Sequence, residues 1–182
     1  ACLMAGLVAF PFIRNLTTGE KGMPGVQIGG HFVLETAEGP LDTSTLKSDL
    51  MLIYFGYTYC PDVCPTELAR MAGIYEGLGD DQARVSGLFV TVDPKRDTVN
   101  AVTEYAQVFD PSFKGLSGDQ GQIERVMRRY QVYAQKVGDD PENYTVDHSS
   151  RIYLMDRDAR LMALFSMDTE IPVMIEQVKN FL

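Results

Sequence analysis

Residues 52–68 read LIYFGYTYCPDVCPTEL, and the rest of the chain is organised around this stretch. It opens with a short apolar and aromatic run without alternation, which is typical of a buried strand. Two cysteines, Cys60 and Cys64, follow in a turn, and a helix continues beyond them. Pro65 suits the first position of that helix, because a proline deeper inside would lose a hydrogen bond and clash with the preceding turn.

This arrangement predicts an unusual environment for both thiols. With Pro65 at the helix start and Glu67 in the first turn, Cys64 is expected at the helix entrance and Cys60 one turn before it in the loop. Both sulfurs would then lie near the positive end of the helix dipole, which stabilises a thiolate and lowers the pKa of the thiol. The thiolate is the form that attacks disulfides and binds soft metals.

Length and charge exclude several classes of function. At 182 residues the chain is long enough for one domain with a sizeable core. Its 16 Lys and Arg against 25 Asp and Glu give a net charge of −9, without a basic cluster. This balance argues against binding to nucleic acid or to an anionic membrane surface. The acidic surface fits either a basic protein partner or solubility alone, and both interpretations stay open.

The chain is predicted to have three parts. Residues 1–13 are almost wholly apolar but too few to span a bilayer, which needs about 20 residues. We interpret residues 1–16 as the remnant of a membrane anchor or signal segment, with a short docking helix as the alternative. Residues 17–30 are rich in glycine and predict a flexible link, so the domain is expected over 31–182. Cys2 is the odd cysteine and a candidate for lipidation.

Apolar periodicity in the domain predicts strands that alternate with helices. Strands are expected at 31–35, 86–92, 151–156 and 161–165, the last two as a hairpin, and helical stripes at 68–75, 102–109, 123–130 and 171–182. Asp119 and Gln122 resemble a capping box, and Pro172 suits the first turn of the last helix. His31, a lone histidine beside glycines, is interpreted as a surface residue. The order predicts an α/β fold with a mixed central sheet flanked by helices.

Three blocks of sequence carry a resemblance to a known family. A cysteine pair between a strand and its helix resembles the thioredoxin-like fold. Residues 55–65, FGYTYCPDVCP, resemble the signature of the Sco/SenC family, and 92–98, VDPKRDT, and 144–154, YTVDHSSRIYL, resemble its second and third blocks in the same order. The resemblance covers about 29–182, with small departures at Val99 and His31. It implies a copper-handling assembly factor of cytochrome c oxidase, with His148 of the third block as a metal ligand.

The residue chemistry agrees with a copper site formed by Cys60, Cys64 and His148. Thiolates select Cu(I) and zinc, and an added imidazole extends the range to Cu(II). A site with three protein ligands is too open for structural zinc, which is usually bound by four. The alternatives are a structural disulfide, disfavoured because such a short loop gains little from closure, and a histidine in a surface loop. The stretch 138–147 is long and polar, so His148 is expected to swing onto the sulfurs when metal binds. Met71, Met127 and Met174 fall on helical core faces and are interpreted as packing.

The second block is expected near the cysteines, because the carboxyl ends of parallel strands share one edge of the sheet. It contains Asp93, Lys95, Arg96 and Asp97. Asp97 or Thr98 is predicted to cap the next helix. A role for this block in electrostatic tuning of the site or in partner docking stays open.

Three functions compete on this sequence. The first is a copper chaperone, not an enzyme, that delivers Cu(I) or Cu(II) to the binuclear copper site of an oxidase subunit. The second is a thiol–disulfide oxidoreductase that reduces that subunit's cysteines through a redox disulfide between Cys60 and Cys64. The third is a thiol peroxidase, but the chain lacks the Thr-x-x-Cys pattern that peroxiredoxins have before the cysteine. A general oxidoreductase is disfavoured because three residues separate the cysteines and no proline precedes Ile152.

The expected setting follows from the resemblance and the apolar start. We expect a monomer tethered to the inner membrane in the bacterial periplasm, with the mitochondrial intermembrane space as the alternative. The expected partners are the copper-site subunit of cytochrome c oxidase and other periplasmic copper chaperones or a thiol reductant, without nucleic acid.

Overall fold

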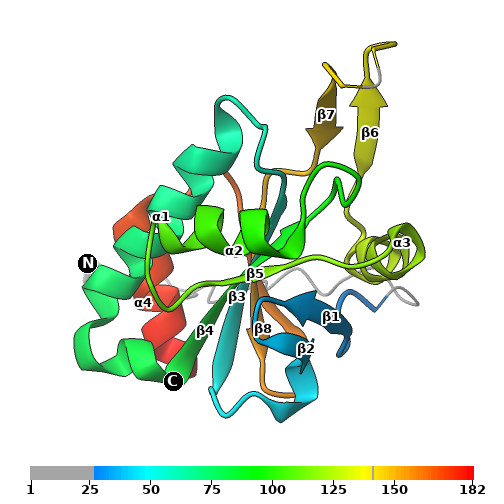
Figure 1. Cartoon of the computed structure of the whole chain (residues 1–182). Coiled ribbons are helices and arrows are strands. Elements are labelled where there is room, and N and C mark those ends of the chain that lie inside the picture. The colour runs from blue at the N-terminus through cyan, green and yellow to red at the C-terminus, as the bar shows by residue number, and fades with distance from the viewer. Residues whose placement is uncertain (1–26, 141) are drawn as a thin grey trace, which may run out of the picture.

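Strand β3, Leu50–Gly56, lies at the centre of the domain and is buried at all seven positions. The structure, a computed structural model, describes residues 27–140 and 142–182. β3 pairs in parallel with β4, Val85–Thr91, and antiparallel with β8, Ile152–Asp156. β5, Lys114–Leu116, and β9, Leu161–Phe165, complete the order β5-β4-β3-β8-β9 (Figure 1). The predicted mixed sheet and C-terminal hairpin are therefore confirmed.

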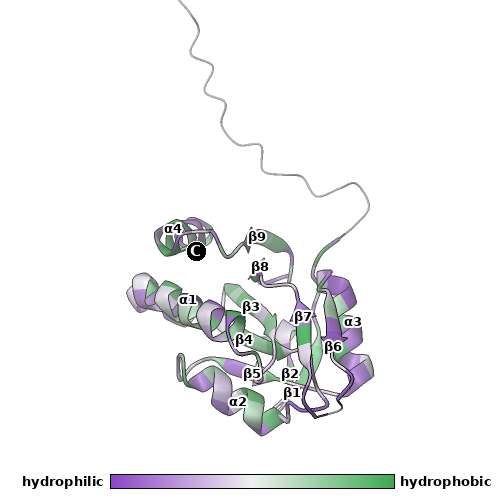
Figure 2. Cartoon of the chain, turned by 90° about the horizontal axis from the view of Figure 1, so that it is seen from above, coloured by the Kyte–Doolittle hydropathy of each residue, from purple (hydrophilic) through white to green (hydrophobic). Residues whose placement is uncertain are grey.

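Helices cover both faces of this sheet. Helices α1, Val63–Leu78, α2, Val99–Gln107, and α4, Ile171–Phe181, lie on one face, and α3, Gln120–Tyr130, lies on the other (Figure 2). The connections β3-α1-β4 and β4-α2-β5 step in the same direction across the sheet, so right-handed crossovers place both helices on the same face. Because β3 is covered on both sides, its sequence is a continuous apolar run without alternation.

Two smaller sheets accompany the central one. β1, Val33–Thr36, and β2, Gly39–Asp42, form a hairpin, and β6, Ala134–Val137, pairs antiparallel with β7, Thr145–His148. β1 is bridged through Glu35 to Ser117, just after β5. Two short 3₁₀ helices follow β2 and α1, at Thr43–Thr45 and Gly79–Arg84. None of the helices in the described part of the chain has the length and apolar character that a bilayer crossing requires.

The predicted helix ends are largely confirmed. Asp119 Oδ1 accepts from the Gln122 N–H at 2.7 Å, and Gln122 Oε1 accepts from the Asp119 N–H at 2.8 Å, which completes the capping box of α3. Pro172 lies in the first turn of α4. Thr98, one of the two candidates, is the N-cap of α2 and accepts from the Ala101 N–H at 3.2 Å. His31 was predicted to be a surface residue, but it is half-buried, with Nδ1 3.2 Å from Thr43 Oγ1.

The start of α1 lies close to the predicted one, which put Pro65 at or near the first position. The helix begins at Val63, so Pro65 is its third residue and Cys64 its second. This position also tolerates proline, because the first N–H groups of a helix have no partner within the helix. Glu67 is therefore the fifth residue, beyond the first turn, and it is fully buried and pairs with Arg70 at 2.6 Å.

The stretch 138–147 differs from the predicted loop. Its last three residues belong to β7, where Asp147 faces Gln135 and His148 faces Ala134 of β6. His148 is therefore the last residue of a paired strand, where we predicted a loop that brings it in with the metal. The predicted anchor at 1–16 falls outside the described residues, as does most of the link at 17–30.

Candidate metal centre

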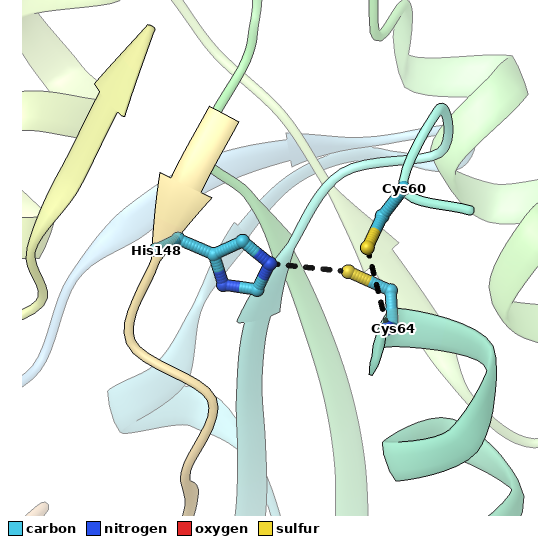
Figure 3. Close-up of side chains that lie close together, drawn as sticks. All are labelled: Cys60, Cys64 and His148. Carbon is cyan, nitrogen blue, oxygen red and sulfur yellow. Dashed lines mark hydrogen bonds between the residues drawn. The ribbon is translucent and has the colours of Figure 1, made fainter. Parts of the chain in front are cut away.

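Cys60, Cys64 and His148 come together from three different segments. Cys60 lies in the loop between β3 and α1, Cys64 in the first turn of α1, and His148 at the end of β7. One donor atom from each, the two sulfurs and one ring nitrogen, lie within 4.8 Å of one another (Figure 3). Among the described residues, this is the one group of three or more His, Cys, Asp or Glu side chains arranged to hold a metal ion.

The three side chains already point toward one another. His148 Nε2 lies 3.4 Å from Cys64 Sγ, and the backbone N–H of Cys64 donates to Cys60 Sγ at 3.4 Å (Figure 3). His148 Nδ1 lies 3.0 Å from the Ser149 carbonyl oxygen. A ring that donates its Nδ1–H to a carbonyl presents a lone pair on Nε2, the form that binds a metal. Both cysteines are free thiols.

The pKa of the Cys64 thiol shifts in the direction opposite to the predicted one. Cys64 is fully buried, and this burial raises the pKa of its thiol instead of lowering it. Removal of water disfavours the thiolate more strongly than the helix start favours it. Burial also lowers the pKa of His148, which keeps the imidazole neutral. A metal cation would supply the positive charge that a thiolate needs here and would displace the thiol proton.

The floor of the site contains two residues to which sequence reasoning assigned no role. A Cβ atom at Gly56 would lie 2.7 Å from Cys64 Sγ and 3.0 Å from the rings of Tyr54 and Phe89. Only a glycine at the end of β3 therefore leaves room for the sulfur. The Tyr54 hydroxyl donates to Cys64 Sγ at 3.7 Å. The signal in the sequence was the glycine that ends the apolar run.

One side of the site is open to solvent. Cys60 retains 9% of its exposure, whereas Cys64 retains none. A shallow cavity of about 390 Å³ opens between the cysteine loop and strand β7, and it is lined by Tyr57, Cys60, Pro61, Asp62, Val63 and residues 145–148. Another molecule can thus reach the site past Cys60 and His148.

The second sequence block lies beside the cysteine loop, as expected. The Asp97 carboxylate accepts from the Thr58 N–H at 3.0 Å and from the Thr58 and Thr91 hydroxyls at 2.5 and 2.7 Å. Asp97 thus fixes the cysteine loop to the end of β4 rather than capping α2. Burial raises the pKa of Asp97. Asp93 and Arg96 form an ion pair at 2.6 Å, and Lys95 next to them is exposed.

The methionines are part of the packing. Met71 and Met174 are fully buried, and Met127 is half-buried against the core. None of them belongs to the Cys-Cys-His group.

Comparisons of the sequence and the fold with known proteins all indicate the same protein family. A family model described as SCO1/SenC matches residues 20–182. An SCO2-like protein of Rickettsia conorii is 40% identical over 98% of this chain and 92% of its own length. The human mitochondrial SCO1 homologue is 35% identical over 78% of this chain and 48% of its own length. The structure of Bradyrhizobium japonicum ScoI with copper bound matches with a TM-score of 0.78 and 41% identity, over 85% of this chain and 99% of that one.

Proposed function

The chain belongs to the SCO1/SenC family, and from this premise we propose that it is a copper chaperone that delivers its metal to the binuclear copper site of cytochrome c oxidase. The ligands would be Cys60, Cys64 and His148. The observation that carries the proposal is the three-donor group, whose donor atoms lie within 4.8 Å of one another. Copper in a relative of the same fold and 41% identity supports the choice of metal.

The donor set accounts for the preference among metals. Two thiolates and one imidazole are soft to intermediate donors, which favour Cu(I) and leave Cu(II) accessible through the nitrogen. Binding of Cu(I) releases the two thiol protons, and the resulting bis-thiolate and imidazole complex carries one negative charge. That charge is best tolerated next to solvent, where Cys60 keeps part of its exposure.

Delivery requires that the metal leave as readily as it enters. An incoming thiolate or imidazole can approach through the opening past Cys60 and His148 and replace one ligand at a time. A structural metal site would instead close four ligands around the ion. The oxidase as recipient rests on the family and stands as part of the proposal.

A thiol–disulfide oxidoreductase is the second candidate, and one observation favours it. The two free thiols lie close enough to pair. In such a reaction both thiols would lose their protons and form the Cys60–Cys64 disulfide, while a disulfide in the partner would take up two electrons and two protons. Because the disulfide removes both sulfur donors, reduction of a partner and copper binding exclude each other in one molecule.

We place the protein in the bacterial periplasm, tethered to the inner membrane by residues 1–16, with the mitochondrial intermembrane space as the alternative. Its relatives occur in bacteria and in mitochondria. The proposed partners are the copper-site subunit of the oxidase and periplasmic copper donors or thiol reductants. We propose that this chain binds each of them as a monomer.

The test is a titration of the fully reduced protein with Cu(I) against a chromogenic chelator. We expect one copper per chain, and Cys60→Ala should abolish tight binding. His31→Ala is the matched control, because it removes the other histidine of the chain, which lies outside the Cys-Cys-His group. Stoichiometric tight binding by Cys60→Ala would contradict the site.

Delivery is tested separately. The copper-loaded protein is mixed with a metal-free soluble copper domain of an oxidase subunit, and the absorption of the binuclear centre is followed over time. Failure of that band to appear would contradict delivery while leaving copper binding intact.

A further inference from the structure

We propose that Arg96 is a positioning residue that holds the β6–β7 hairpin, and with it His148, against the two cysteines. The proposal deepens the proposed function and rests on His148 as a ligand. Arg96 lies in the connection between β4 and α2, and its side chain is only 12% exposed. It contacts two of the three segments that supply donors to the site, the cysteine loop and the β6–β7 hairpin.

The β6–β7 hairpin needs such an anchor. Its two strands pair only with each other and form no part of the central sheet. Figure 1 shows them projecting from the body of the domain. The central sheet holds the chain only from Ile152 onward, four residues after His148, so the orientation of the hairpin before it depends on further contacts. Contacts between the loop end of the hairpin, at Glu142 and Tyr144, and the body of the domain help to do this.

Arg96 makes several contacts at this loop end of the hairpin. Its guanidinium carbon lies 3.5 Å from the centre of the Tyr144 ring, and Nη1 donates to the Tyr144 carbonyl at 2.9 Å and to the Glu142 carbonyl at 3.5 Å. Nε donates to Asp93 Oδ2 at 2.6 Å, and the Tyr144 hydroxyl donates to Asp93 Oδ1 at 2.7 Å. Arg96, Asp93 and Tyr144 thus form a closed triangle that joins the end of β4 to the start of β7.

The same guanidinium also contacts the cysteine loop. Its carbon lies 4.7 Å from the centre of the Tyr59 ring and 5.7 Å from that of Tyr57. Tyr59 directly precedes Cys60 in the chain. The Tyr57 hydroxyl accepts from the Val146 N–H at 3.2 Å, two residues before His148. Arg96 therefore lies between the segment with Cys60 and the segment with His148.

These contacts need an arginine rather than any cation. The planar guanidinium can stack on a ring while its edge donates to a carboxylate and to backbone carbonyls at once. A lysine ammonium is a compact point charge and cannot keep both functions. Lys136 illustrates the difference, because its Nζ lies 4.2 Å from the centre of the same Tyr144 ring but it is exposed. Lys136→Ala therefore removes one positive charge next to Tyr144 and leaves the triangle in place.

The first measurement needs no metal. Amide hydrogen exchange and the ring resonances of His148 are recorded by NMR in the reduced, metal-free protein and in Arg96→Lys. We expect faster exchange confined to residues 134–148 and shifted His148 resonances, with α1 unchanged and with wild-type behaviour in Lys136→Ala. Unchanged exchange in the hairpin of Arg96→Lys would overturn the proposal, whatever the protein does with copper.

The second measurement is a double-variant cycle on Cu(II) affinity, read by the thiolate charge-transfer band. Loss of residues that orient a metal ligand typically weakens binding by about 10–100-fold, and we expect a loss in this range for Arg96→Lys. In the His148→Ala background the same substitution should cause no further loss. Losses that multiply would show that Arg96 acts independently of His148 and would overturn the proposal.

The two proposals can fail separately. If the wild-type protein binds no copper, the proposed function fails while the hydrogen-exchange result still tests Arg96. If Arg96→Lys fails to fold, Tyr144→Phe removes one side of the triangle, the hydroxyl bond to Asp93, and should shift hairpin exchange in the same direction. An unchanged hairpin in Tyr144→Phe would then count against the proposal.

Discussion

At Cys64, burial and the helix start act on the thiol in opposite directions, and burial prevails. The residue is in the first turn of α1, but it packs beneath Gly56 and Tyr54 with no exposed surface. A neutral thiol beside a neutral imidazole is stable in such a place without metal. Cys64 is therefore expected to become a thiolate when a metal cation replaces its proton.

His148→Ala should weaken Cu(II) binding far more than Cu(I) binding. Cu(I) can be held by two thiolates alone, whereas Cu(II) prefers nitrogen and oxygen donors and readily oxidises an exposed thiolate pair. His148 Nε2 already faces Cys64 Sγ, so its removal deletes a donor in place. The measurement is paired affinities, with Cu(I) by chelator competition and Cu(II) by its charge-transfer band. Equal losses for both ions would show that the imidazole has no selective role.

Gly56→Ala should both destabilise the fold and disturb the site. The new Cβ would come within 2.7 Å of Cys64 Sγ and 3.0 Å of two aromatic rings. Overpacking of this kind costs about 1–3 kcal/mol, measurable by urea unfolding, and a displaced sulfur should lower Cu(I) affinity. Gly121→Ala is the control, since its Cβ would meet no atom closer than 3.3 Å. Wild-type copper affinity in Gly56→Ala would show that the sulfur position tolerates the shift.

At the scale of elements, the position of α1 depends on its contact with α4. Glycines on α1 let α4 approach closely: a Cβ at Gly77 would lie 2.2 Å from Ile175 Cδ1, and one at Gly73 would lie 3.3 Å from Ile171 Cδ1. Arg70 completes the contact, because it donates to the Ser166 and Thr169 carbonyls before α4. Since α1 carries Cys64, this interface fixes one side of the metal centre.

Arg70→Ala should destabilise the domain by about 3–5 kcal/mol, because it leaves the buried Glu67 carboxylate without its partner at 2.6 Å. Burial already raises the pKa of Glu67 above its usual 4.5, so the folded state favours the protonated form. The variant should thus be most stable at or below pH 4.5 and should lose stability as the pH rises through the raised pKa. Urea unfolding over this range checks both the size and the sign.

The control for Arg70→Ala is the double variant Glu67→Gln/Arg70→Ala. It removes the charge that the single variant leaves buried, so it should recover part of the lost stability and lose the pH dependence. If it recovers nothing, the cost arises from the freed carbonyls of Ser166 and Thr169 instead.

At the scale of the molecule, the metal centre joins segments that lie far apart in the chain. The loop after β3, the connection after β4 and the hairpin before β8 meet at the edge where the parallel strands end. Among the described residues, the buried core beneath them begins at Phe32, and β3 is buried throughout. Folding and metal binding should therefore both reside in this domain.

Deletion of residues 1–14 should leave a folded, copper-binding protein. The three candidate ligands lie outside this segment, and the described residues 27–140 and 142–182 already form a continuous core. We expect an unchanged melting temperature and an unchanged Cu(I) affinity, measured by calorimetry and by chelator titration. A large drop in melting temperature would show that the segment packs into the domain.

The sequence alone determined the features that short-range physics controls. The apolar run at 52–55, the capping box at Asp119 and Gln122 and the proline at 172 predicted a strand and two helix starts, because such signals act within a few residues. The spacing of Cys60 and Cys64 predicted a thiol pair at a helix start, and resemblance added His148. These side chains do lie together.

Tertiary structure decided what depends on segments distant in sequence. Burial of Cys64 follows from the packing of α1 on Gly56 and reverses the direction of its pKa shift. Pairing of β7 with β6 makes His148 part of a strand, where polar composition had suggested a mobile loop. Arg96 contacts Tyr144 across 48 residues of chain. Desolvation and side-chain contact are set by which surfaces meet in three dimensions, and local sequence spacing does not contain that information.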